Sequence, residues 1–321
     1  MRIIHRPDWT ISEARVTPEA VALARRTLLG GAGAALAIRP AAAQLSWFGT
    51  AKPLPARPPL PARHDPQFTG GRPLTPEEAA ITYNNFYEFG TDKNIAWAAQ
   101  TLPVSPWNIE IAGLVAKPRT IALEDLLKQE SLEERIYRHR CVEAWAMTVP
   151  WTGFPLAALV KLADPLSSAR YLRFTTLADR KAMPGLEQPW YPWPYIEGVT
   201  MAEATNELAF LSLGMYGKII PKQDGAPIRL TLPWKYGFKS AKSIVKVEFV
   251  EKRPVGFWQQ VQGNEYGFWA NVNPAVPHPR WSQAQERLLG TNEMVPTQIW
   301  NGYGKYVAEL YAGLKNERLF M

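Results

Sequence analysis

The sequence predicts a mixed domain of helices and short strands joined by long connections. Its 321 residues, 46% of them hydrophobic, are enough for one large core or two small ones. The 29 prolines argue against a helical bundle, because proline interrupts helices and collects in turns and loops. Strand-like and helix-like segments also intermix without the regular order of a βαβ fold.

The segments with strand character alternate polar and apolar residues or are rich in β-branched and aromatic ones. They are residues 107–111, 119–121, 134–138, 170–176, 228–232 and 243–249. Two further segments predict helices, at residues 123–128 and 155–162, and residues 75–78 predict the start of another. This start has Thr75 as a candidate cap, Pro76 in the first turn and two acidic residues at the helix N-terminus. Residues 83–90 end at a glycine and predict a loop packed on the domain.

The N-terminus has the pattern of an export signal. Arg25-Arg26 precede a weakly apolar run that ends at three alanines, 41–43, and this order defines a secretory signal peptide. The arginine pair resembles a twin-arginine (Tat) signal, so we expect residues 1–43 to be a Tat-type signal cleaved near Ala43. The alternatives are an ordinary Sec signal or an amphipathic tail. The run is too short and too rich in Gly and Ala for a transmembrane helix.

Export has consequences for the rest of the chain. Tat carries folded proteins, so we expect a periplasmic protein that receives its cofactor before export. Residues 1–43 carry six arginines and three acidic residues, so cleavage lowers the net charge from +7 to +4 and leaves no need for a nucleic-acid partner. Residues 44–75 are rich in proline and predict an extended leader without a core of its own. Residues 76–321 remain as the catalytic domain.

The single cysteine, Cys141, follows Arg138-His139-Arg140. One thiol forms no intramolecular disulfide, and neighbouring positive charge favours a thiolate, which is a soft ligand for a redox metal. The alternative is a merely buried cysteine, the common fate of a free thiol. The sequence has no G-x-G-x-x-G, P-loop or H-E-x-x-H motif, and its four histidines are too scattered for a zinc site. It also lacks the C-x-x-C-H of a c-type haem.

Several blocks together decide between these readings of Cys141. They are residues 84–90, 133–138, 141–145, 149–156, 225–229, 233–239, 266–274 and 278–283. In this order, behind a Tat-like signal, they resemble the periplasmic protein-methionine-sulfoxide reductase catalytic subunits, molybdenum enzymes of the sulfite-oxidase fold. The resemblance runs from about residue 75 to the C-terminus and implies an α+β, β-rich molybdopterin fold in a single domain.

The resemblance also implies a molybdopterin cofactor without an added nucleotide, whose metal is bound by Cys141. The cofactor-binding positions match Asn84, Tyr87, Glu88, Thr176, Asp224, Arg229, Ser240, Ala241 and Lys242. Arg229 and Lys242 are suited to a phosphate, and amide and hydroxyl groups suit a pterin edge. The family usually has asparagine where this chain has Asp224. Glu143, two residues beyond Cys141, is our candidate for moving a proton or orienting a ligand.

The implied activity is the reduction of methionine sulfoxide in oxidised periplasmic proteins. Electrons would come from a haem-containing membrane subunit, MsrQ, since this chain has no evident second redox cofactor. Trp145 and other aromatic residues would give an apolar approach to the thioether. Two alternatives stay open: a sulfite oxidase-type dehydrogenase of the same fold, with several arginines around an anion, and a non-enzymatic exported binding protein.

Overall fold

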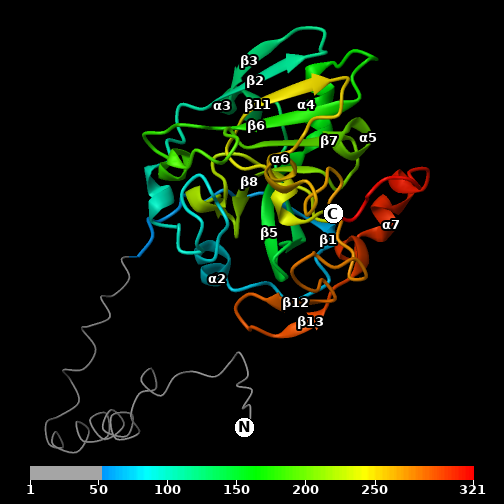
Figure 1. Ribbon diagram of the computed structural model, residues 1–321. Helices are drawn as coiled ribbons and strands as arrows, with labels where there is room; N and C mark the ends of the chain where they lie inside the picture. The colour runs from blue at the N-terminus through cyan, green and yellow to red at the C-terminus, as the bar shows by residue number, and fades with distance from the viewer. Residues whose placement is uncertain (1–52) are drawn as a thin grey trace, which may run out of the picture. The chain divides into compact units, whose positions relative to one another are not determined.

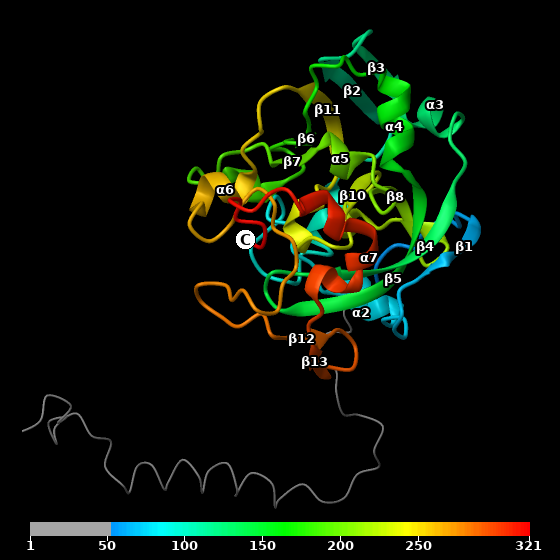
Figure 2. The same ribbon diagram turned by 90° about the vertical axis from the view of Figure 1, so that its right-hand side faces the viewer.

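The computed structural model describes residues 53–321, and the predicted signal peptide and residues 44–52 lie outside this range. In the described part the strands form two sheets, which occupy different ends of the fold (Figures 1 and 2). The larger sheet contains β1 Arg63–Thr69, β4 Glu133–Arg140, β5 Trp145–Pro155, β8 Phe210–Met215, β9 Lys218–Ile219, β10 Arg229–Thr231, β12 Gln285–Leu288 and β13 Met294–Pro296. The smaller sheet has the order β3 Arg119–Ala122, β2 Asn108–Gly113, β11 Ile244–Val250, β6 Tyr171–Thr176 and β7 Ile196–Thr200.

Strand β5 is the centre of the larger sheet. It pairs with β4 along its length, with β8 over its second half and with β12 at its start. All of its residues except Pro155 are buried, as expected for a strand covered on both faces. The sequence did not predict this strand, because Pro150 and Gly153 normally interrupt one.

The five-stranded sheet contains most of the strands that the sequence predicted. β2, β3, β6 and β11 match predicted segments, and alternation decides which side chains enter the core. In β6, for example, Leu172 and Phe174 are fully buried while Tyr171 and Arg173 are only partly covered. β11 joins β2 in parallel and β6 antiparallel, so it lies at the centre of this sheet.

The helices of the described part are short. They are α2 Glu77–Thr82, α3 Leu123–Leu127, α4 Leu156–Ala163, α5 Met201–Ala204, α6 Phe257–Gln262 and α7 Gly304–Val307, with 3-10 turns at Ala98–Thr101, Pro184–Glu187, Lys222–Asp224, Gly237–Lys239, Ile299–Gly302 and Ala308–Tyr311. The predicted helices form α2, α3 and α4. The predicted cap at Thr75 was wrong: Pro76 is the capping residue, and the Thr75 hydroxyl instead accepts from the Thr148 N–H at 3.0 Å.

The proline-rich segment does more than lead into the domain. We expected residues 44–75 to be an extended leader, and the described part is extended. Residues 63–69, however, pair in parallel with β4 as strand β1, and the Phe68 ring is buried in the main core. Phe68 packs edge to face on Tyr137 at 5.4 Å, so this segment shares the core of the domain.

The predicted mixed, β-rich α+β class is confirmed. Residues 54–321 form one compact unit with a continuous core. Within residues 53–321 no helix combines the length and hydropathy needed to span a bilayer.

Gly153 gives a direct test of the arrangement around β5. A Cβ at this position would lie 1.9 Å from the Leu211 carbonyl oxygen, where the pairing with β8 shifts register. The backbone of β8 cannot move aside as a flexible side chain could. Gly153→Ala should therefore lower the free energy of unfolding by about 3 kcal/mol. Gly313→Ala is the control, because nothing lies within 4 Å of its added Cβ. Denaturant unfolding of samples matched for cofactor content measures both, and equal effects would contradict the strand arrangement.

Candidate active site

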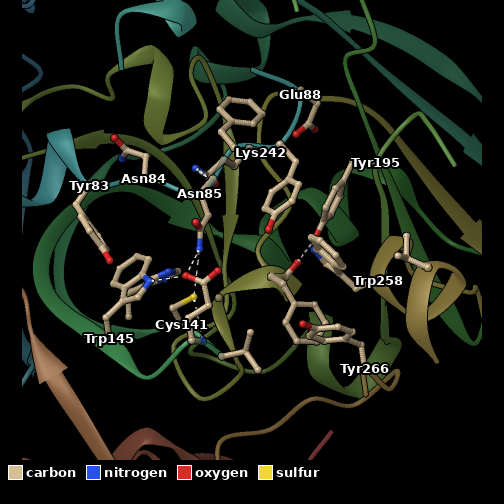
Figure 3. A pocket seen from close by; sticks show the side chains of 18 of the residues that line it. Tyr83, Asn84, Asn85, Glu88, Cys141, Trp145, Tyr195, Lys242, Trp258 and Tyr266 are labelled. Carbon is tan, nitrogen blue, oxygen red and sulfur yellow. Dashed lines mark hydrogen bonds between the residues drawn. The ribbon is translucent and has the colours of Figure 1, made fainter. Parts of the chain in front are cut away.

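A cavity of about 570 Å³ contains most of the predicted site residues. Its wall is formed by stretches of the chain that are far apart in sequence, around residues 83–88, 139–147, 191–195, 224–242, 258–266 and 280–281. Asn84, Tyr87, Glu88, Cys141, Glu143, Asp224, Arg229 and Lys242 all line it. In Figure 3 the Cys141 thiol lies opposite Lys242 and Glu88 across this space.

A tight turn between β4 and β5 places Cys141 on the cavity wall. Its N–H donates to the Trp145 carbonyl at 2.9 Å, and its own carbonyl accepts from Ala144 N–H at 3.1 Å. Ala144 closes the turn with a φ of 62°. The thiol is therefore held by a rigid pair of buried strands, with only 6% of the residue exposed.

Burial outweighs the charge of Arg140, which acts to lower the pKa of the Cys141 thiol as the sequence predicted. Successive residues of a strand point to opposite faces, and only His139 shares the cavity with Cys141. Arg140 is fully buried and donates to Glu286 at 2.8 Å, while Arg138 donates to Gln298 at 2.6 Å. Burial, followed by the charge of Glu143, raises the pKa of the Cys141 thiol to about 12. A bound cation, in place of the arginines, is what would make this thiol a thiolate.

Glu143 is held as an ionised group beside the thiol. Its Oε2 accepts from Lys93 at 2.7 Å, from Asn85 at 3.1 Å and from the Trp145 indole at 3.2 Å. Burial acts to raise the pKa of this carboxyl, but the hydrogen bond and charge of Lys93 outweigh burial and the pKa lies below its ordinary value. An ionised carboxylate with these three donors is less suited to the predicted role of supplying a proton, and the predicted role of orienting a ligand stays open.

Positive charge is concentrated on the wall opposite Cys141. Lys242 donates to the Asn85 and Gln223 carbonyls at 2.9 Å each, and Arg229 donates to the Asp224 carbonyl at 2.9 Å. Burial lowers the pKa of Lys242 to about 7 and that of Arg229 to about 10. Gly225 allows this approach: its φ is +103°, and a Cβ there would lie 2.7 Å from the Lys242 side chain. Among residues 53–321 neither the buried Arg229 nor the partly buried Lys242 forms an ion pair with a carboxylate, and both suit an anionic ligand.

Acceptor groups with free capacity lie next to these cations. Asn84 donates to Asp224 Oδ1 at 2.7 Å, yet Asn84 Oδ1 and Asp224 Oδ2 are buried without a hydrogen-bond partner. Burial raises the pKa of the Asp224 carboxyl to about 6. Burial likewise raises the pKa of Glu88 to about 7. Unpaired buried acceptors are rare in native proteins and indicate a ligand with N–H or O–H donors.

Three predicted residues do not line the cavity. Thr176 is buried behind Glu88 and donates to its carboxylate at 3.4 Å. Ser240 and Ala241 face the interior: the Ser240 hydroxyl accepts from Leu232 N–H at 3.2 Å, and the Ala241 carbonyl accepts from Leu230 N–H at 2.8 Å. These contacts fix the segment that carries Lys242, so the three residues support the wall from behind.

The cavity also contains residues that the sequence analysis did not single out. Asn85 reaches the thiol itself, with Nδ2 3.4 Å from Cys141 Sγ. An aromatic wall faces this pair in Figure 3, where Tyr195, Trp258 and Tyr266 are labelled. Trp258 packs edge to face on Tyr87 at 4.8 Å and tilts against Tyr266 at 5.3 Å. The aromatic content of residues 257–269 was the available signal for this wall.

Comparison with known proteins identifies the family. The profile of the oxidoreductase molybdopterin binding domain matches residues 97–258, about half of the chain. The protein-methionine-sulfoxide reductase catalytic subunit MsrP of Ralstonia nicotianae is 47% identical, covering 97% of this chain and 96% of its own. This chain belongs to the MsrP family. The MsrP of Pseudomonas syringae pv. tomato is 48% identical, covering 94% of this chain and 95% of its own. The sulfane dehydrogenase SoxCD of Paracoccus pantotrophus covers 67% of this chain and 58% of its own at 17% identity, with a TM-score of 0.41.

Membership of the MsrP family makes this a molybdopterin-dependent oxidoreductase, and the cavity fits the cofactor. The cations Lys242 and Arg229 that line the cavity suit its phosphate, and the unpaired acceptors of Asn84 and Asp224 suit the donor edges of a pterin. Cys141 is the thiol on the wall that could bind the metal. These residue assignments remain predictions.

The buried Glu88 carboxyl predicts a pH effect on the cofactor-free protein. Its folded-state pKa of about 7 lies above its ordinary 4.5, so between these values the folded protein binds more protons than the unfolded chain. The free energy of unfolding therefore falls as pH rises from 4.5 to 7, by about 3 kcal/mol from this group. Glu88→Gln should remove that part of the decline, as measured by urea unfolding at pH 5 and pH 8. Parallel declines in the two proteins would show that Glu88 does not titrate in this window.

Proposed function

We propose that this protein reduces methionine sulfoxide residues in oxidised proteins. The single observation that carries the proposal is the combination around one cavity of a buried thiol, two cations and an aromatic surface, in a chain of the MsrP family. When bound, the molybdenum cofactor supplies two-electron oxygen-atom chemistry. The overall reaction takes two electrons and two protons, releases one water and leaves the thioether.

The residues of this chain assist in three ways. Cys141 is presented by the β4–β5 turn for binding the metal. Lys242, Arg229 and the acceptors beside them hold the pterin and its phosphate. Tyr87, Trp258 and Tyr266 form an apolar face on which a methionyl side chain can pack, since contacts of sulfur with aromatic rings are favourable by about 1 kcal/mol.

The charge distribution disfavours the sulfite oxidase-type alternative. Among the described residues, the arginines that line the cavity are Arg229 and Arg280. Arg229 is directed at backbone carbonyls, and Arg280 is paired with Glu265 at 2.8 Å. A pocket for a small dianion would need several arginines converging on one point beside Cys141.

We further propose that the protein works in the periplasm with a haem-containing membrane subunit of the MsrQ kind as electron donor. The name of the relatives, a catalytic subunit, supports a second subunit that supplies electrons. The twin arginine and alanine-rich site of residues 1–43 support Tat export. Replacing Arg25 and Arg26 with lysine should retain the protein in the cytoplasm; undiminished export would point to the Sec route.

Cys141→Ser tests the proposed chemistry. A serine hydroxyl is a harder, less readily ionised ligand than a thiolate, so molybdenum-dependent reduction of methionine sulfoxide peptides should fall at least 100-fold, given the usual weight of metal ligands and their partners. The assay uses dye-supplied electrons and protein made in a cofactor-competent host, with metal content determined on the same sample.

Two results would overturn the proposal. Wild-type protein that oxidises sulfite but does not turn over the sulfoxide would support the sulfite oxidase-type activity. Cys141→Ser protein with full molybdenum content and full activity would show that the thiol is not the ligand.

A further inference from the structure

We propose that Lys93 is a positioning residue that orients the Asn85 amide, so that an N–H of this amide donates to the sulfur of Cys141. Lys93 was not among the residues that the sequence pointed to. The inference rests on the proposed function in one respect, the use of Cys141 as the molybdenum ligand.

Four contacts define the arrangement. Lys93 Nζ donates to Asn85 Oδ1 and lies 2.7 Å from Glu143 Oε2. Asn85 Nδ2 lies 3.1 Å from the same carboxylate oxygen and 3.4 Å from Cys141 Sγ. The lysine ammonium can only donate hydrogen bonds and an ionised carboxylate can only accept them. Only one orientation of the Asn85 amide therefore satisfies both groups.

The opposite orientation of the Asn85 amide is unfavourable for two reasons. Turning the Asn85 amide over would set its oxygen against the Glu143 carboxylate and its NH₂ group against the Lys93 ammonium. It would also turn the amide oxygen towards the sulfur and remove the hydrogen bond to Sγ. The Trp145 indole N–H holds the carboxylate at 3.2 Å, so Glu143 cannot simply move aside.

The backbone fixes Lys93 at this distance. The Lys93 carbonyl accepts from Asn84 N–H at 3.3 Å, which closes the loop that carries Asn85. Asp92 Oδ1 accepts from Asn94 N–H at 2.6 Å, which stabilises the turn around Lys93. From the other side Lys242 donates to the Asn85 carbonyl at 2.9 Å. Figure 3 shows the Asn85 side chain directed at Cys141 from this loop.

A hydrogen bond to a thiolate ligand draws electron density from the sulfur and raises the reduction potential of its metal. Contacts of this kind around a metal site typically change activity by about 10–100-fold when removed. The Lys93 side chain is 23% exposed and that of Glu143 is 31% exposed, so their ion pair contributes little to stability. Its contribution is the orientation of Asn85.

The test uses the cofactor-loaded protein and compares Lys93→Met, Lys93→Arg, Asn85→Leu and the double variant Lys93→Met/Asn85→Leu. Lys218→Met is the matched control, because Lys218 pairs with Glu77 at 2.8 Å and does not line the cavity. Molybdenum content, the electron paramagnetic resonance spectrum of the metal and its reduction potential are measured on each protein.

Lys93→Met should keep its molybdenum, shift the spectrum, lower the potential and reduce activity about tenfold. Arginine can donate to both oxygens, so Lys93→Arg should restore the spectrum. Because Lys93 acts through Asn85, the double variant should match Asn85→Leu alone, whereas independent effects would add.

An unchanged spectrum and potential in Lys93→Met, or additive effects in the double variant, would overturn the inference. A Lys93→Met protein without metal would also contradict it, because a positioning residue leaves loading intact. Absence of molybdenum from the wild-type protein is a different result, which would refute the proposed function instead.

Discussion

The partial or complete burial of two positive charges beside one cavity is the constraint on which this structure depends. Arg229 is buried and Lys242 is partly buried, and their guanidinium and ammonium groups are met mainly by backbone carbonyls. Such burial is unfavourable for an empty protein, as the lowered pKa of both groups indicates. It becomes favourable when an anion occupies the cavity. We therefore interpret residues 224–242, which bring these two groups together, as the cofactor-binding segment and call it the cofactor cradle.

The remainder of the fold supplies a rigid frame for this cradle. Strands β4 and β5 present Cys141 on a tight turn, and the fully buried pair of Arg140 with Glu286 ties that turn to β12. Removing one partner of such a pair would leave the other charge buried and cost about 3–5 kcal/mol. The loop of residues 84–93 then closes over the thiol and brings the Asn85 amide to it. Under the proposed assignments, the metal, the phosphate and the substrate would contact three separately anchored parts of one domain.

Local patterns predicted much of the fold, and their failures have physical causes. Strands β2, β6 and β11 followed from alternation and β-branched residues. β5 was not predicted because Pro150 and Gly153 normally break strands. In the structure, pairing with β4 on one side and β8 on the other stabilises the strand at these positions. The arginines beside Cys141 in the sequence do not suffice to ionise its thiol, because burial outweighs the charge of Arg140 and because Arg138 and Arg140 point away from the face that carries Cys141.

The site residues were predicted from the sequence segments that resemble the family. Eight predicted positions line the cavity, whereas Thr176, Ser240 and Ala241 support it from behind. Lys93 could not be found, because a lysine in a polar turn has no local pattern that distinguishes it from a solvated one. Only the closed loop, in which its carbonyl accepts from Asn84, brings its side chain to Asn85 and Glu143.

Replacing Lys242 with methionine tests the cofactor cradle most directly. Methionine relieves the cost of burying a charge while losing two hydrogen bonds, so the cofactor-free protein should change in unfolding free energy by no more than about 1 kcal/mol. The molybdenum content of the purified protein should nevertheless fall at least tenfold, while Lys246→Met, on a partly exposed lysine of β11, should load normally. Full molybdenum content in Lys242→Met would contradict the account that the positive charge on this wall holds the cofactor.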